Sequence, residues 1–184
     1  MTDNIDKYNK GNATVKNGAD DQKSDKTDNL ENNIEDNERK MVDVIIPTYR
    51  PAKEFGELLH RLEKQEYRPN RILVMNTGKE YWNSEWENYP LLEVHHLDQK
   101  DFDHGGTRKR AAELSTADIM VFMTQDALPA DRKMIGNLVR AVSRNSGTGA
   151  AYARQLPNAD CRFLERYTRS FNYPEQSSVK SLSD

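Results

Sequence analysis

The sequence predicts an α/β protein with a mainly parallel, Rossmann-like β-sheet and helices on both faces of that sheet. Two observations lead to this prediction. Short apolar, β-branched runs alternate along the chain with segments whose apolar residues recur at helical spacing, a pattern typical of parallel sheets. Polar side chains also gather directly after each apolar run, and parallel sheets bind ligands beyond the carboxyl ends of their strands.

The first 40 residues differ in composition from the rest of the chain. They are mostly Asp, Asn, Lys, Glu, Thr, Ser and Gly, and their few aliphatic residues show no period. Such a segment buries too little apolar surface to offset the entropy of ordering, so we predict a disordered tail at 1–40 and one domain at 41–184. The tail lacks the apolar core of a signal peptide. Its acidic residues outnumber its basic ones, which argues against a nucleic-acid-binding arm.

The domain opens with a predicted strand, helix and strand. The run 42–47 is β-branched and ends in proline, so we interpret it as a buried first strand, followed by a loop at 48–51. Four apolar residues share one face over 54–65, which predicts a helix. The apolar run 71–76 ends in Thr and Gly, which favours a second strand.

A third strand and a second helix follow. Residues 79–90 are polar and aromatic, which indicates a loop or short helix. Residues 91–97 are interpreted as a strand. The segment 101–107 is rich in turn formers and contains paired glycines. A helix is then predicted over 108–114.

The last predicted elements are two strands around a helix. The run 119–123 is apolar at every position, which is typical of a strand buried on both faces. A loop follows at 125–129. Residues 132–144 place their apolar side chains on one helical face, and a fifth strand is predicted at 150–154.

The polar residues at the strand ends are the candidate ligand site, since the carboxyl ends of parallel strands meet at one edge. Those after the first two strands suit a base and a ribose, and those after the next two suit phosphate and metal. In chain order they are Thr48, Tyr49 and Arg50; Asn76, Thr77 and Gly78; Asp98 and the segment 101–108; and Thr124, Gln125 and Asp126.

Two of these groups have alternative interpretations. The segment 104–108 (HGGTR) could bind an anion through close backbone approach, a helix N-terminus and Arg108; it could equally be a turn with Thr107 as the helix cap. Asp126 could hold Mg²⁺ or Mn²⁺ together with substrate phosphates, or it could be a turn residue.

Several other residues carry weaker signals. His60, His95 and His96 have no partner at metal-ligand spacing, so we interpret them as structural. The aromatic residues of 79–90 could stack on a base or sugar, or pack their own loop. The single cysteine excludes an internal disulfide, and no apolar run reaches the roughly 18 residues of a spanning helix, so we expect a cytoplasmic protein, soluble or peripheral at the membrane.

Five stretches resemble glycosyltransferase family 2, which has the GT-A fold, and are closest to its rhamnosyltransferase-like members. They are VDVIIPTYR at 42–50, with Arg50 where the family usually has Asn; DFDHGGTR at 101–108; FMTQDALP at 122–129; and AYARQLP with RYTRSFNYP at 151–157 and 166–174. The resemblance implies a nucleotide-diphosphate sugar donor, often dTDP-rhamnose. It also implies divalent-metal assistance, inversion at the sugar, and transfer to a cell-surface polysaccharide or lipid-linked acceptor.

The resemblance also assigns roles to residues of this sequence. Thr48 and Tyr49 would frame the base, and Asn76 stands where many relatives have an Asp that reads the base or ribose. Asp126 matches the later Asp of the family's metal motif, with Thr124 in place of the first. The implied donor-binding set is Thr48, Tyr49, Arg50, Asn76, Gly78, His104, Gly105, Gly106, Arg108 and Gln125.

The general base of an inverting transfer is not identified. In the family it lies in a later half that also carries much of the acceptor site, whereas this sequence ends at Asp184. Nothing singles out Asp160, Glu165 or Glu175 as a replacement. We therefore expect a donor-binding part of a glycosyltransferase, or alternatively a non-catalytic nucleotide-sugar-binding remnant or the first half of a split enzyme. A nucleotidyltransferase is disfavoured, because no glycine-rich, lysine-bearing segment follows the first strand.

Overall fold

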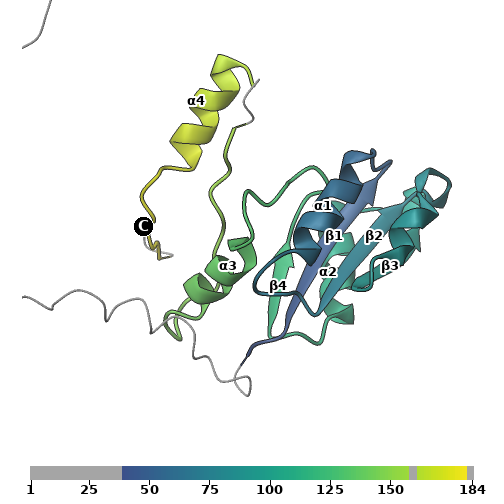
Figure 1. Cartoon of the computed structure of the whole chain (residues 1–184), viewed down its shortest axis with the longest axis horizontal. Coiled ribbons are helices and arrows are strands. Elements are labelled where there is room, and N and C mark those ends of the chain that lie inside the picture. The colour runs from purple at the N-terminus through teal and green to yellow at the C-terminus, as the bar shows by residue number, and fades with distance from the viewer. Residues whose placement is uncertain (1–38, 158–160, 182–184) are drawn as a thin grey trace, which may run out of the picture. The chain divides into compact units, whose positions relative to one another are not determined.

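The computed structural model describes residues 39–157 and 161–181. Apart from Arg39 and Lys40, the predicted tail lies outside these residues, and the division into tail and domain stays a prediction. Within them the chain forms a parallel sheet in the order β3-β2-β1-β4, which confirms the predicted α/β class (Figure 1). Its strands are β1 (Val42–Tyr49), β2 (Arg71–Thr77), β3 (Leu92–Leu97) and β4 (Ile119–Phe122).

Helices cover both faces of the sheet, as predicted. The helices α1 (Glu54–Glu63) and α3 (Met134–Val142) lie on one face, and α2 (His104–Leu114) lies on the other. The described chain also forms α4 (Phe163–Asn172) and the short 3-10 helices η1 (Lys79–Tyr81), η2 (Ser84–Asn88) and η3 (Gln99–Asp101). Even-numbered residues of β1 and β2 pack with α1, α3 and Trp86 in one core cluster. Odd-numbered residues pack with Ala111 of α2 in another. The alternation follows from the two-residue period of a strand.

The parallel register aligns one residue from each of three strands at the carboxyl edge of the sheet. Thr48 of β1 pairs with Asn76 of β2, and Asn76 pairs with His96 of β3. Thr48 and Tyr49 therefore belong to β1. The loop predicted at 48–51 begins only at Arg50, two residues later than predicted. The three aligned side chains lie on the face covered by α1, because they share the parity of the residues in that core cluster.

The prediction that 119–123 is buried on both faces is wrong. Met120 and Phe122 are 41% and 46% exposed. Within the described residues β4 is an edge strand, and α2 packs on β1 and β2 instead of β4. The strand is therefore covered on one face, where Val121 joins the core.

Two further predictions need correction at the carboxyl-terminal end. Residues 150–154 form no strand, since they pair with no other strand in the described part of the chain. The helix α4 was not predicted, although Phe163, Leu164, Tyr167 and Phe171 recur at helical spacing. All four side chains are exposed.

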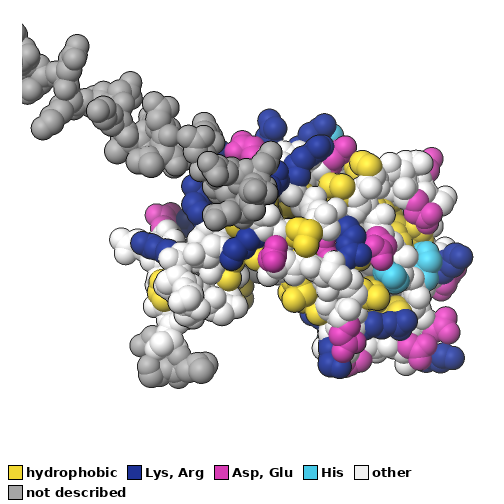
Figure 2. Space-filling view, turned by 90° about the horizontal axis from the view of Figure 1, so that it is seen from below, with side chains coloured by type: hydrophobic (Ala, Val, Ile, Leu, Met, Phe, Trp, Pro, Cys, Tyr) yellow, Lys and Arg dark blue, Asp and Glu magenta, His cyan; other side chains and the backbone are white. Residues whose placement is uncertain are grey.

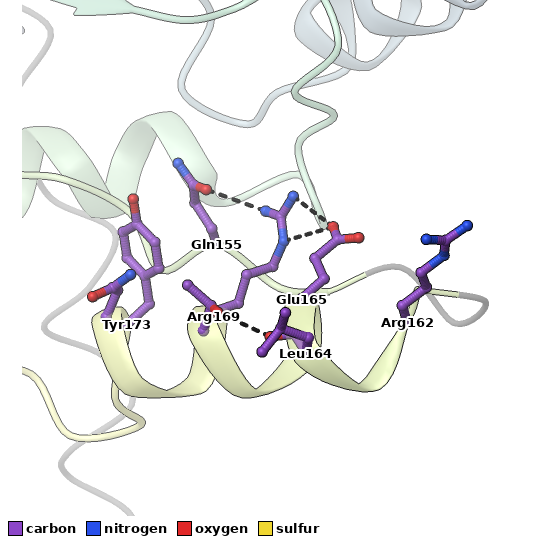
Figure 3. A pocket seen from close by; sticks show the side chains of 8 residues that line it. Gln155, Arg162, Leu164, Glu165, Arg169 and Tyr173 are labelled. Carbon is purple, nitrogen blue, oxygen red and sulfur yellow. Dashed lines mark hydrogen bonds and ion pairs between the residues drawn. The ribbon is translucent and has the colours of Figure 1, made fainter.

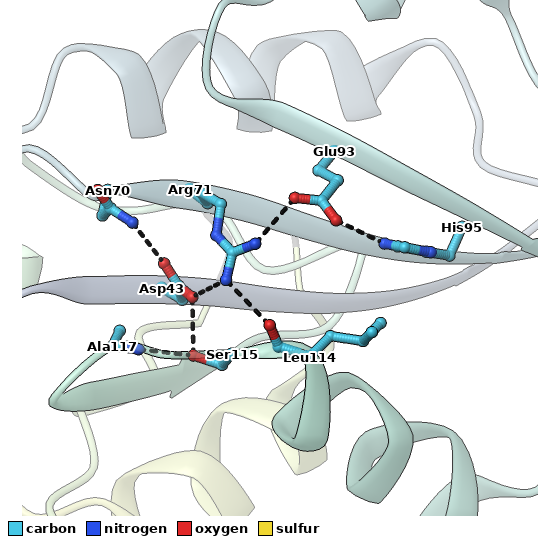
Figure 4. Close-up of polar contacts among 8 residues, drawn as sticks. All are labelled: Asp43, Asn70, Arg71, Glu93, His95, Leu114, Ser115 and Ala117. Atoms are coloured by element: carbon cyan, nitrogen blue, oxygen red, sulfur yellow. Dashed lines mark hydrogen bonds and ion pairs between the residues drawn. The ribbon is translucent and has the colours of Figure 1, made fainter.

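An ion-pair network closes the amino end of the sheet (Figure 4). The fully buried Asp43 of β1 accepts hydrogen bonds from Arg71 at 2.9 Å, from Ser115 at 2.7 Å and from Asn70 at 3.3 Å. Arg71 also donates to Glu93 at 3.0 Å. Burial by itself raises the pKa of the Asp43 carboxyl, but these hydrogen bonds outweigh burial and hold that pKa below its usual value.

Charges of both signs are mixed on the surface. On the face seen in Figure 2, Lys and Arg side chains alternate with Asp and Glu side chains. This face therefore has no extended basic stripe of the kind that binds a nucleic-acid backbone. Within the described residues, every helix falls short of the length and apolar character that a bilayer-spanning helix needs.

Candidate functional site

A row of hydrogen bonds crosses the carboxyl edge of the sheet. The Thr48 hydroxyl donates to Asn76 Oδ1 at 2.9 Å, and Asn76 Nδ2 lies 3.3 Å from the carbonyl oxygen of Gly78 and 3.0 Å from Nδ1 of His96. Thr48 and Asn76 are both buried. Both N–H groups of the Asn76 amide are thus used inside the protein, and its buried oxygen accepts from Thr48. The predicted base-reading residue has no N–H left to donate to a ligand.

The same row fixes the protonation of His96. An amide NH₂ only donates, so Nδ1 of His96 is the acceptor and Nε2 carries the ring proton. Burial, and secondarily the charge of Lys79, lower the pKa of His96, with an opposing effect from Glu87. The lowered pKa favours the neutral imidazole, which carries its proton on Nε2.

A small pocket lies beside this imidazole, between the ends of β2 and β3. Its volume is about 270 Å³, near the lower limit of roughly 300 Å³ for small-molecule sites. Its walls are Gly78, Lys79, Glu80, His96, Leu97, Asp98 and Gln99. The pocket has room for one end of a ligand, and its walls offer both cationic and anionic groups.

Gly78 shapes the entrance of η1 next to the pocket. Its φ of 80° lies in the left-handed region that disfavours side chains, and an added Cβ would lie 2.9 Å from Cδ2 of Tyr81. The backbone conformation and the nearby Tyr81 ring therefore favour glycine at position 78. The predicted donor-binding role of Gly78 stays a prediction.

Gly78→Ala is expected to lower the free energy of unfolding by about 1–2 kcal/mol, because it combines backbone strain with a side-chain clash. The measurement is urea unfolding followed by tryptophan fluorescence. Gly149→Ala is the matched control, since an added Cβ there meets nothing within 4 Å, and we expect it to change stability by less than about 0.5 kcal/mol. Equal effects of the two substitutions would contradict the role of Gly78.

Aromatic rings and one guanidinium form an exposed stack at the end of β1. Arg50 lies over the ring of Tyr81, 4.3 Å from its centroid, and over Tyr49 at 5.1 Å, and it donates to the Tyr81 hydroxyl at 2.7 Å. Arg50 has a φ of 46°, a left-handed conformation uncommon for a residue with a side chain. The stack holds a cation and flat π surfaces at the edge where a ligand is expected.

Gln125 ties the loop after β4 to β1. Its Oε1 accepts from the Tyr49 amide at 2.8 Å and its Nε2 donates to the Tyr49 carbonyl at 3.1 Å. The side chain thereby continues the β1–β4 pairing beyond Phe122 and positions the turn that contains Asp126. Both polar groups of the Gln125 amide are bound to the Tyr49 backbone, so the side chain holds the loop in place.

The first turn of α2 differs from the predicted anion cradle. The helix begins at His104 instead of Arg108, because Asp103 is its N-cap: the Asp103 carboxylate accepts from the Gly106 amide. Thr107 is buried in the helix and is not the cap. Arg108 donates to the His104 carbonyl at 2.9 Å.

Glycine at 106 has a steric reason, since an added Cβ would lie 2.9 Å from Asp103 Oδ2. His104 packs edge-to-face on Phe102, with ring centroids 4.9 Å apart. The Asp103 carboxylate thus already occupies the Gly106 amide, one of the backbone groups that the predicted anion site would use.

The possible metal ligands are few. Asp126 is exposed in a turn directly after β4, and no group of three or more His, Cys, Asp and Glu side chains gathers anywhere in the described ranges. A single carboxylate fits the mode in which Mg²⁺ takes one or two protein ligands and completes its shell with substrate phosphates and water. The donor set is therefore compatible with a metal bound jointly with a diphosphate.

A second, open pocket of about 560 Å³ lies along α4. Arg169 there is paired with Glu165 at 3.0 Å and donates to Gln155 at 3.2 Å (Figure 3). Glu175 is paired with Arg154 at 3.4 Å. The two described carboxylates considered as candidate bases thus each face an arginine, and Asp160 lies outside the described residues. No local pattern in the sequence predicts this pocket.

Comparison with known proteins decides the family. The family described as glycosyl transferase family 2 matches residues 43–182. The chain belongs to this family. The match includes β1 from Asp43 onward, the other three strands in full and every residue of the candidate site.

Two curated relatives of this family 2 chain come from Salmonella. The O-antigen chain rhamnosyltransferase RfbN of Salmonella typhimurium is 37% identical over 150 residues, which are 78% of this chain and 46% of that protein. The O-antigen chain rhamnosyltransferase WbaN of Salmonella anatum is 27% identical over 143 residues, or 77% and 45% of the two chains. The chain thus spans about half the length of these relatives and is rhamnosyltransferase-like in sequence.

Among solved structures, a mannosyltransferase from Pyrobaculum calidifontis in complex with GDP-Man and Mn²⁺ has a TM-score of 0.46 and 24% identity to this chain. The aligned part covers 55% of this chain and 32% of the mannosyltransferase chain. A crystal structure of TarS residues 1–349 from S. aureus has a TM-score of 0.48 and 17% identity, over 64% and 40% of the chains.

Proposed function

We propose that this chain is the donor-binding part of a metal-assisted, inverting rhamnosyltransferase. The donor would be a nucleotide-diphosphate sugar, with dTDP-rhamnose the first candidate, and the acceptor a polysaccharide or lipid-linked saccharide of the O-antigen type. The observation that carries the proposal is the 37% identity to an O-antigen chain rhamnosyltransferase over 78% of this chain. The strand-end location of the candidate site supports it.

The chemistry of the proposed reaction fits the groups at this edge. Breaking the anomeric C–O bond builds positive charge on the sugar and negative charge on the leaving diphosphate. A divalent ion held by Asp126 and the diphosphate would neutralise the leaving group as it departs. Arg50 is the exposed cation nearest the end of β1 and could hold phosphate or stack on the base.

A second candidate function is donor binding without transfer. Glu165 and Glu175 are each paired with an arginine, and no described contact joins either carboxylate to the strand-end site where a general base would have to act. In that case a separate polypeptide segment would supply the base. Because the donor would be a cytoplasmic nucleotide sugar, we place the protein in the cytoplasm, with peripheral contact to the membrane where the acceptor is lipid-linked.

The test is calorimetric titration of dTDP and UDP into the chain, with and without Mn²⁺. We expect binding that Mn²⁺ strengthens, and an Asp126→Ala variant in which the Mn²⁺-dependent part is weakened at least tenfold, about 1.4 kcal/mol. Glu113→Ala, which removes an exposed carboxylate at the carboxyl end of α2, is expected to bind like the original chain. A folded chain that binds neither nucleotide would overturn the proposal.

A further inference from the structure

We propose that the pocket between the ends of β2 and β3 binds the carbonyl edge of a pyrimidine base, with the Nε2–H of His96 as the donor that selects it. This inference rests on the proposed function, because it assumes a nucleotide donor. It names a specificity-determining residue that the sequence interpretation had treated as structural.

The geometry of the hydrogen-bond row leads to His96. Asn76 stands at the position expected to read the base, yet it is buried and its amide is engaged by Thr48, Gly78 and His96. Reading therefore passes to the next residue in the row. Of these three side chains, it is His96 that lines the pocket between the ends of β2 and β3.

The tautomer of His96 determines what it selects. With Nδ1 accepting from Asn76, the ring presents a single donor at Nε2 and no acceptor. Thymine and uracil carry a carbonyl oxygen at C4, across the ring from the nitrogen that bears the sugar, whereas cytosine carries an amino group there. In the proposed pose the Nε2–H meets this position, so the C4 carbonyl accepts it and the amino group leaves it unpaired. A site built around one donor rejects the ligand that lacks an acceptor at the matching position.

The neighbours of His96 hold the ring in place. Trp82 contacts the imidazole edge-to-face at 6.0 Å between centroids, and Trp82 is itself packed against Phe55 and Trp86. Asn76 is therefore a positioning residue that fixes the tautomer, and the tryptophan pair fixes the ring plane. A donor held by two such constraints loses little entropy when a ligand binds.

The experiment compares dTDP with CDP by calorimetric titration in the presence of Mn²⁺. We expect the original chain to bind dTDP about tenfold more tightly than CDP. His96→Phe should weaken dTDP binding about tenfold and change CDP binding little, so that the ratio falls toward one. His95→Phe is the matched control, because His95 neighbours His96 in β3, has the opposite strand parity and pairs with Glu93. It should keep the original ratio.

A second readout does not depend on the variants folding. In ¹⁵N-labelled chain, Nε2 of His96 should carry the proton, and its chemical shift should move on addition of dTDP while that of His95 stays fixed. An unchanged dTDP-to-CDP ratio in a folded His96→Phe variant, or an Nδ1-protonated His96, would overturn the inference and leave nucleotide binding intact. Absence of any nucleotide binding by the original chain would instead overturn the proposed function, and this inference with it.

Discussion

Asp43→Asn is expected to lower the free energy of unfolding by about 3 kcal/mol, because it removes the buried charge partner of Arg71 and leaves that arginine with only the more exposed Glu93. Asp43 is fully buried, whereas the side chain of its partner Arg71 is 28% exposed. The substitution keeps the size of the side chain, so the loss reports charge and hydrogen bonding instead of packing. Urea unfolding at pH 7 measures the loss.

The matched control is Glu93→Gln, which removes the more exposed carboxylate bound by the same arginine. Surface pairs contribute less than about 1 kcal/mol, so we expect the Asp43 effect to be several times larger. The lowered pKa of Asp43 also fixes the pH dependence. Its contribution is present above the unfolded-state pKa of about 3.9 and is lost as pH falls through the folded-state pKa. The stability of Asp43→Asn should therefore vary less with pH below about 4, and losses of equal size in both variants would refute the network.

Asn76→Ala is expected to lower the free energy of unfolding by about 2–3 kcal/mol. The truncated side chain leaves the Thr48 hydroxyl and the Gly78 carbonyl without their partner in a buried place. It also frees Nδ1 of His96, so the Nε2-protonated tautomer loses its preference. Unfolding in urea measures the first effect, and the ¹⁵N shifts of His96 measure the second.

Asn83→Ala provides the control for Asn76. Asn83 is exposed and caps η2 by accepting from the Glu85 amide at 3.0 Å, so its loss should cost roughly 1 kcal/mol and leave His96 unaffected. A stable Asn76→Ala variant with an unaltered His96 tautomer would show that the row does not organise the site.

Much of the sheet was predictable because strands and helices differ in period. The residues 42–47 and 71–76 were assigned to strands from apolar runs alone, and the helix over 54–65 from its four-residue face. The burial of β4 was not predictable. An apolar run shows that a strand can be buried, but whether it is depends on which elements lie beside it.

The candidate site likewise has a part that was predictable from the sequence and a part that was not. Its position at the strand ends follows from the parallel topology, so Thr48, Asn76 and Gly78 were identified correctly as neighbours at one edge. The donor-binding roles of the predicted set, and the metal role of Asp126, stay predictions. The contact between His96 and Asn76 was not predicted, because it depends on strand register, which no local pattern reports.

The row formed by Thr48, Asn76 and His96 also constrains how the chain reaches its fold. A slip of β2 by one residue against β1 or β3 would move Asn76 to the opposite face of the sheet. Thr48 and His96 would then lose their hydrogen-bond partner. The three side chains thus penalise every misaligned pairing of these strands. Substitutions at these positions that change ligand selectivity would also reduce the energy difference between the native strand register and its alternatives. We therefore expect ligand selectivity and correct strand pairing to change together along this edge.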